Sequence, residues 1–303
     1  MRIAVVTGAN GFVGSAVVNE LVKHRYKVYA LVHAGHSSRL KQSGSVEIVN
    51  CTLENIEEAA SSIHEKCDVF YHFAWEGSAG RARADTRLQL QNAQWSAQCV
   101  EMAKKLGCAR FIFAGSIAEK ECLASVYTDG FRPGGGCIYG GGKVAAHVLC
   151  SCIAAAEGID FLGGEITNAY GVGEESPRLL NTVIRKCIEG VSPELTEGSQ
   201  NYDFVYIDDV ARAFRLIGEK GKPFTTYTIG SSHTRTLKEF MSELQDTVAP
   251  NIPFLFGKIP FSGASLPLSA FDCTAAERDT GFRAEIPFRE GCMRTYVWWR
   301  DRK

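Results

Sequence analysis

The segment Thr7-Gly8-Ala9-Asn10-Gly11-Phe12-Val13-Gly14 is the starting point for interpreting this 303-residue chain. Its glycines are spaced G-x-x-G-x-x-G between a buried-strand pattern over residues 2–7 and a helical pattern over residues 12–24. Glycine permits a tight turn and lets backbone N–H groups approach a pyrophosphate, which would face the positive end of the helix. We therefore predict a dinucleotide-binding turn rather than an ordinary glycine-rich connection. Its expected cofactor contacts are Gly8, Asn10, Gly11, Phe12, Val13 and Gly14.

Strand and helix patterns alternate beyond this turn. A strand pattern at 27–32 completes a βαβ unit, which implies a parallel sheet. Further strand candidates lie at 46–50, 68–74, 110–115 and 159–166, and further helix candidates at 54–65, 86–106 and 140–157. This alternation predicts the α/β class, with a Rossmann-type doubly wound parallel sheet over residues 1–170.

The pattern becomes less regular after residue 170. Strand and helix patterns resume at 205–216, 226–230 and 237–248. Four prolines among apolar residues mark 249–268 as an ordered loop or strand pair. We expect residues 171–303 to form mainly a smaller, mixed α/β C-terminal substrate domain, with some segments returning to the Rossmann core.

Composition favours a cytoplasmic protein that binds neither nucleic acid nor a membrane. The net charge of −1 provides no basic field, and we see no apolar run near the roughly 20 residues that a membrane span needs. Residues 1–8 are typical of a first strand rather than a secretory signal. The 11 cysteines are scattered and form no zinc pattern with histidine, so we expect no metal site and reduced cysteines.

Several motifs, in order, resemble the extended short-chain dehydrogenase/reductase family of NAD(P)-dependent nucleotide-sugar epimerases, dehydratases and reductases. Besides the glycine turn, they are FYHFA at 70–74, Ser116, YGGGK at 139–143, NAYGVG at 168–173 and DFVYIDDV at 203–210. The resemblance covers nearly the whole chain. It implies that Phe73, Ala74 and Asn92 contact the cofactor, and that helices 86–106 and 140–157 build a homodimer.

A predicted catalytic group consists of Ser116, Tyr139 and Lys143. The tyrosine and the lysine lie four residues apart, on one face of a helix. An ammonium beside a phenol lowers the tyrosine pKa, which suits a general acid/base. Without the other motifs, a tyrosine and a lysine at this spacing would be interpreted as two surface residues of a helix. The resemblance implies that Lys143 also binds the nicotinamide ribose, and that Ser116 hydrogen-bonds the reacting oxygen.

The residues after Ser116 depart from the family's dehydratases, which have Asp-Glu there. This chain has Ile117 and Ala118, neither of which can transfer a proton, and Glu119 stands one place too far along. A 4,6-dehydratase is therefore less favoured than a ketoreductase or an epimerase.

The end of the second strand bears on the cofactor. NAD enzymes usually carry an acidic residue there, but this chain has Val32-His33. His33 and Arg39, with Ser37 and Ser38, could bind a 2′-phosphate, so NADP(H) is favoured over NAD(H). Because net reductases commonly consume NADPH, we expect NADPH-dependent 4-ketoreduction of a nucleotide-linked (deoxy)sugar. The alternative is a 4-epimerase with tightly bound NAD.

The expected substrate contacts are Ser116, Ile117 and Asn168, of which Asn168 matches the family's diphosphate contact. Two positions where the family often has arginine hold Glu165 and Tyr202 here. Possible replacements are Arg178, Arg235 and Arg278. The missing arginine at 202 would permit a reductase of a smaller carbonyl compound. A non-catalytic NADP(H)-sensing protein is a separate alternative.

Overall fold

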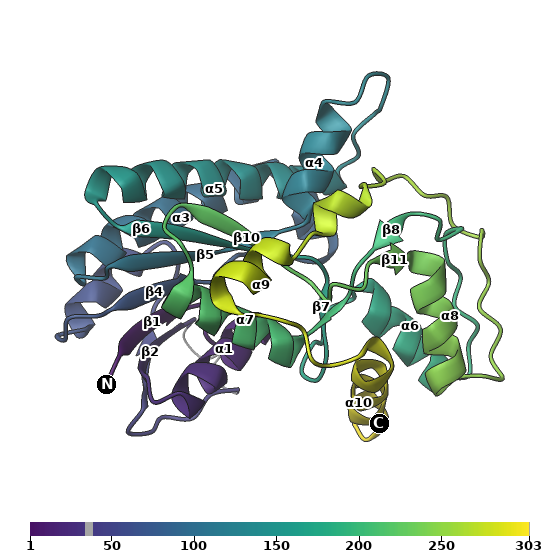
Figure 1. Ribbon diagram of the computed structural model, residues 1–303, viewed down its shortest axis with the longest axis horizontal. Coiled ribbons are helices and arrows are strands. Elements are labelled where there is room, and N and C mark those ends of the chain that lie inside the picture. The colour runs from purple at the N-terminus through teal and green to yellow at the C-terminus, as the bar shows by residue number, and fades with distance from the viewer. Residues whose placement is uncertain (34–38, 303) are drawn as a thin grey trace.

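Seven parallel strands form the central sheet of the computed structural model, which describes residues 1–33 and 39–302. Their order across the sheet is β10-β6-β5-β4-β1-β2-β3 (Figure 1). The strands are β1 (Ile3–Thr7), β2 (Lys27–Val32), β3 (Val46–Asn50), β4 (Val69–His72), β5 (Arg110–Ser116), β6 (Asp160–Ile166) and β10 (Thr225–Ile229). The predicted doubly wound α/β fold is confirmed, and the strand order reverses between β1 and β4.

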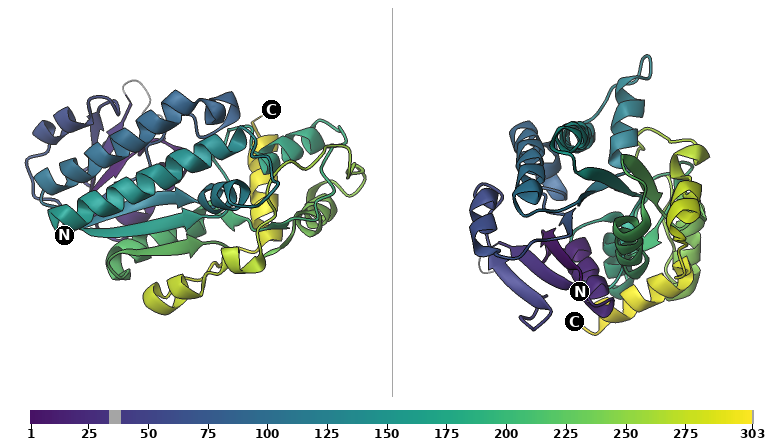
Figure 2. Two further views of the ribbon diagram at one scale, coloured as in Figure 1. Left: turned by 90° about the horizontal axis from the view of Figure 1, so that it is seen from above. Right: turned by 60° about the vertical axis from the view of Figure 1, so that its left-hand side comes forward.

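Helices cover both faces of this sheet (Figures 1 and 2). One face packs against α1 (Phe12–Lys23) and α7 (Ile207–Lys220), and the other against α2 (Ile56–Ala59), α3 (Thr86–Lys105) and α5 (Gly136–Glu157). Each interface has its own hydrophobic core. The strands are apolar on both sides because both faces are covered.

The C-terminal residues build a smaller part beside the carboxyl ends of the strands (Figure 1). Its strand pairs are β8 (Asn201–Tyr202) with β11 (Arg235–Thr236) and β7 (Ala169–Tyr170) with β9 (Val205–Tyr206). Its helices are α6 (Leu179–Ile188), α8 (Leu237–Val248) and α10 (Phe288–Arg300). Rings of Tyr170, Phe204, Phe240 and Phe288 pack together in its core. Segments β10, α7 and α9 (Thr274–Thr280) pack with the main sheet or its helices.

Several elements differ from the sequence predictions. The helix expected at 54–65 is the short α2 followed by the 3-10 turn η1 (Ala60–Ser62). Residues 249–268 follow the loop alternative and not the strand pair, apart from an isolated bridge of Leu255 with Glu194. Helix α4 (Ala118–Val126) was not predicted, because residues on its buried face, such as Ala118, Cys122 and Ser125, are small and give no strong apolar periodicity.

Helix α5 is long and apolar enough to cross a membrane by length and composition, which the sequence analysis did not anticipate. In the structure it packs against α3, α4 and β6. It also carries the buried Tyr139 and Lys143. Burial in the core accounts for only part of its apolar character, because 39% of the apolar window is buried and Val148 is exposed.

Candidate active site

The candidate active site lies at the carboxyl ends of the strands, where the strand order reverses. A cleft of about 430 Å³ is lined there by Gly8, Gly11, Phe12, Val13, Gly14, Arg39, Phe73, Ala74, Ser116, Tyr139, Lys143 and neighbouring residues. In doubly wound sheets this position is the usual ligand crevice. The structure therefore brings most of the predicted cofactor and catalytic residues to one place.

The glycine turn is packed too closely for larger residues. Gly8 has φ +61°, and a Cβ there would lie 2.6 Å from the backbone nitrogen of Ala74. A Cβ at Gly14 would clash with the Gly8 carbonyl oxygen. The Thr7 hydroxyl accepts hydrogen bonds from the backbone N–H groups of Phe73 and Ala74, at 3.2 and 3.3 Å. The first N–H groups of α1, which have no partner within their own helix, lie beside the cleft, and this suits a dinucleotide pyrophosphate.

Three predicted cofactor contacts lie outside the lining of this cleft. The Asn10 side chain accepts a hydrogen bond from the Arg39 backbone N–H at 2.9 Å. The buried Asn92 amide bonds both backbone groups of Glu76 at 2.9 Å, so it supports the loop after β4. His33 is exposed at the end of β2, and Ser37 and Ser38 fall outside the described residues.

Arg39 crosses the cleft toward the C-terminal part. Its guanidinium donates to the Gly173 carbonyl oxygen at 2.5 Å and lies 4.0 Å from the Glu175 carboxylate. Glu175 also pairs with Arg302 at 3.2 Å. A positive charge is thus present in the cleft, although a carboxylate partly compensates it.

Tyr139 is 6% exposed and its ring is held by two neighbours. The guanidinium carbon of Arg83 lies 4.1 Å from the ring centre, and Trp75 packs edge-on at 6.0 Å. Burial raises the pKa of Tyr139, while the charges of Arg83 and Arg178 and the nearby Ser116 side chain oppose that rise. Tyr139 therefore stays protonated at neutral pH and can donate a proton.

The Lys143 side chain is buried and is held by two partners. Its Nζ donates to the Ala114 carbonyl oxygen at 2.9 Å and lies 3.8 Å from the centre of the Trp75 ring. Burial lowers the pKa of Lys143 to about 7. The charges of Arg83 and Arg178 lower the Tyr139 pKa.

Glu119 is buried and its carboxylate is fully engaged. One oxygen accepts from the Ser116 backbone N–H at 2.8 Å, and the other is 2.8 Å from His147 Nδ1. The remaining nitrogen of His147 is 2.9 Å from the Thr226 hydroxyl. No local shift brings Glu119 to the cleft, and Ile117 and Ala118 line the space beside Ser116 instead.

A second cleft, of about 270 Å³, adjoins the first and contains the predicted substrate residues Ser116, Ile117 and Asn168. The Asn168 side-chain oxygen accepts from the Tyr202 hydroxyl at 2.9 Å. Of the three predicted replacement arginines, Arg178 lines this cleft, whereas Arg235 pairs with Glu243 and Arg278 with Asp279. Glu165 is buried against Lys120 at 2.9 Å and lies away from the cleft.

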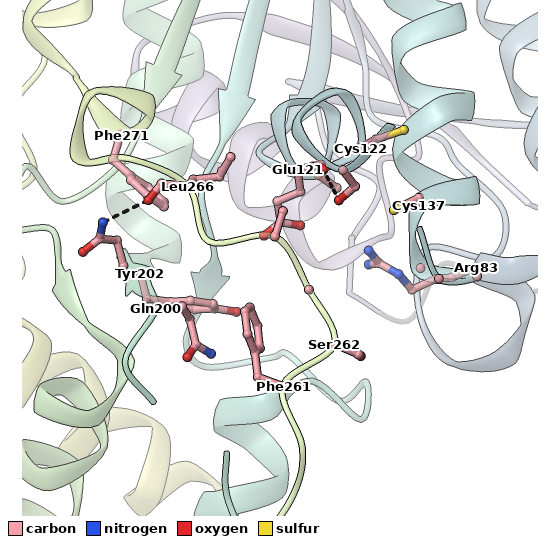
Figure 3. Close-up of a pocket in the computed structure, with 18 residues that line it drawn as sticks. Arg83, Glu121, Cys122, Cys137, Gln200, Tyr202, Phe261, Ser262, Leu266 and Phe271 are labelled. Carbon is pink, nitrogen blue, oxygen red and sulfur yellow. Dashed lines mark hydrogen bonds between the residues drawn. The ribbon is translucent and has the colours of Figure 1, made fainter. Parts of the chain in front are cut away.

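Several charged residues in the clefts were missed by the sequence analysis, and two of them come from neighbouring elements. Arg83, on the 3-10 helix η2 (Gly80–Ala84), and Glu121, on α4, line both the second cleft and a third of about 280 Å³. Figure 3 shows both side chains at this third cleft, beside Tyr202 and Phe261. No sequence motif marks Arg83, and nothing in the sequence distinguishes it from Arg81, two positions earlier in the same segment.

Comparison with known proteins gives the class to which this fold and site belong. Residues 4–230 match the model of the NAD dependent epimerase/dehydratase family. The chain therefore belongs to this family of extended short-chain dehydrogenase/reductase enzymes.

Individual relatives span nearly the whole chain. A dTDP-glucose 4,6-dehydratase of Haemophilus influenzae is 23% identical, covering 99% of this chain and 98% of its own. A UDP-glucose 4-epimerase of Mycolicibacterium smegmatis is 22% identical, with 98% of each chain covered. The structure of a Bacillus cereus UDP-glucuronic acid 4-epimerase in complex with UDP-glucuronic acid and NAD has a TM-score of 0.80 and 20% identity, with 100% of both chains covered. These similarities support the family and the fold without distinguishing the reaction.

Proposed function

We propose that this enzyme is an NADPH-dependent reductase that acts on a 4-keto group of a nucleotide-linked (deoxy)sugar. The observation that carries the proposal is that Ser116 and Tyr139 lie at the junction of two clefts, with Ile117 and Ala118 following Ser116 in place of the dehydratases' Asp-Glu. Hydride is what a bound nicotinamide would supply. Tyr139 would donate the proton to the carbonyl oxygen, and Ser116 would hold that oxygen.

The chain's own residues suit a dinucleotide. The glycine turn offers N–H groups to the pyrophosphate, and Phe73 and Ala74 close over the turn. Lys143 lies at the inner end of the cleft, where a ribose hydroxyl could accept its hydrogen bond. The positive charge of Arg39 supports NADP(H), because no carboxylate follows β2 to repel a 2′-phosphate.

The second candidate is a nucleotide-sugar 4-epimerase with tightly bound NAD. An epimerase requires Tyr139 to accept a proton when the sugar hydroxyl is oxidised and to donate one when the ketone is reduced. The Glu175 carboxylate near Arg39 favours this candidate, since it reduces the positive charge available to a 2′-phosphate. The related 4-epimerases, one of them solved with NAD, also support it.

Cofactor identity and fate separate the two candidates. The purified protein is denatured, and the supernatant is assayed for NAD and NADP. Emptied protein is then titrated with NADPH and NADH, and turnover is measured with UDP- and dTDP-linked 4-keto-6-deoxy sugars. Empty protein that prefers NADPH and consumes it with these substrates supports the reductase. Stoichiometric trapped NAD with interconversion of C4 epimers would contradict it and support the epimerase.

A homodimer is also proposed, built from the outer faces of α3 and α5. Leu90 on α3 and Val148 on α5 are 59% and 55% exposed. Burial of such side chains between two subunits would be favourable. Sedimentation equilibrium tests this proposal, and a monomer at every concentration would contradict it.

A further inference from the structure

Arg83 makes a direct contact with the ring of the catalytic tyrosine. Its guanidinium carbon lies 4.1 Å from the Tyr139 ring centre, and its Nη1 donates to the Ser78 carbonyl oxygen at 3.2 Å. A guanidinium over an aromatic face is attracted by the ring electrons. The contact thus fixes the ring and places a positive charge beside the phenol.

The charge of Arg83 is not paired with a carboxylate among the described residues, 1–33 and 39–302. Glu121 is near enough for Arg83 to lower its pKa, although burial raises that pKa more strongly. Arginine also keeps its charge throughout the pH range of protein stability.

Lys143, by contrast, is directed elsewhere. Its ammonium is held by the Ala114 carbonyl oxygen and by the Trp75 ring. Because burial lowers its pKa to about 7, a large fraction is uncharged above neutral pH. Arg83 therefore places beside the Tyr139 ring a positive charge that does not depend on the protonation of Lys143.

We propose that Arg83 is a positioning residue for Tyr139: it holds the ring by stacking and supplies the positive charge beside the phenol. This inference rests on the proposed function, in which Tyr139 transfers the proton. Two other charged groups bear on the same tyrosine: Arg178, which precedes α6, acts in the same direction as Arg83, and Glu119 on α4 acts in the opposite direction.

Direct titration of Tyr139 tests the inference without any substrate. A fluorotyrosine is placed at position 139, and its ionisation is followed by fluorine NMR in the wild-type background and with Arg83→Gln. An opposite charge within a few ångströms lowers a pKa by about 1–3 units, so Arg83→Gln should raise the midpoint by about one unit. Arg81→Gln is the matched control, because Arg81 is exposed on the same 3-10 helix. An unchanged midpoint in Arg83→Gln would overturn the inference.

Kinetics provide the second measurement. We expect Arg83→Gln to lower kcat about tenfold and to move the alkaline limb of its pH–rate profile to higher pH, with KM nearly unchanged. The titration midpoint in Arg83→Lys should lie between those of wild type and Arg83→Gln, because lysine keeps the positive charge but cannot stack as a planar group. A rise in KM with unchanged kcat would instead make Arg83 a substrate ligand and overturn the inference. If no reductase or epimerase activity exists, the proposed function fails, whereas the titration still decides the role of Arg83.

Discussion

Lys143 donates a hydrogen bond to the carbonyl oxygen of Ala114, at 2.9 Å, on the strand that ends at Ser116. The lysine is therefore positioned by β5 and by the Trp75 ring, on which it lies. The catalytic helix α5 and the strand carrying Ser116 are thus joined at the bottom of the cleft. This bond also holds an amino group in a buried place, where its charged form is disfavoured.

The first prediction concerns stability and pH. Burial lowers the folded-state pKa of Lys143 from 10.5 to about 7, so the unfolded chain binds more protons between those values. The free-energy cost of burying Lys143 in the folded state therefore falls as pH rises through that window. Lys143→Met should be more stable than wild type below about pH 7, and this advantage should shrink toward pH 10.5. Urea unfolding across the range measures the difference, and a difference independent of pH would contradict the assigned shift.

The second prediction explains the glycines inside the Tyr–Lys turn. A Cβ at Gly140 would clash with the Ala118 carbonyl oxygen, and one at Gly142 would lie 2.9 Å from the Gln89 carbonyl oxygen. At Gly141 the nearest atom is Cys122 Sγ, at 3.8 Å. Gly141→Ala should therefore stabilise the protein by up to about 1 kcal/mol through helix propensity.

Gly140→Ala should instead destabilise by about 1–3 kcal/mol, because α4 and α5 must move apart. Chemical unfolding of the two variants is the measurement. Equal effects on stability would show that close helix packing is not the reason for these glycines.

The third prediction concerns the cofactor. If Arg39 holds a 2′-phosphate, Arg39→Ala should weaken NADPH binding about 10- to 100-fold, the range for a hydrogen bond to a charged group. NADH binding should change little. Arg302→Ala is the control, because Arg302 also pairs with Glu175 but does not line the cofactor cleft. Fluorescence titration with both nucleotides provides the affinities, and equal losses for NADPH and NADH would exclude a 2′-phosphate contact.

The sequence was sufficient for features encoded by nearby residues. The glycine turn and the Tyr139–Lys143 spacing are local, and both were placed correctly in the cleft. Contacts between distant segments were not predictable. Glu119 is engaged by His147, 28 positions away, and the stacking of Arg83 on Tyr139 depends on how η2 packs against α5. Asn92 was assigned to the cofactor, but its amide bonds the backbone of Glu76, which no sequence pattern reveals.

Proton transfer by Tyr139, during nicotinamide-dependent chemistry on a sugar carbonyl, is tested most directly by comparing Tyr139→Phe with wild type. Both turnover and dinucleotide affinity are measured. Removing a general acid typically costs about 10²–10⁴-fold in rate. We expect a loss of turnover of this size with cofactor affinity retained. Full activity of Tyr139→Phe would show that Tyr139 is not the proton donor.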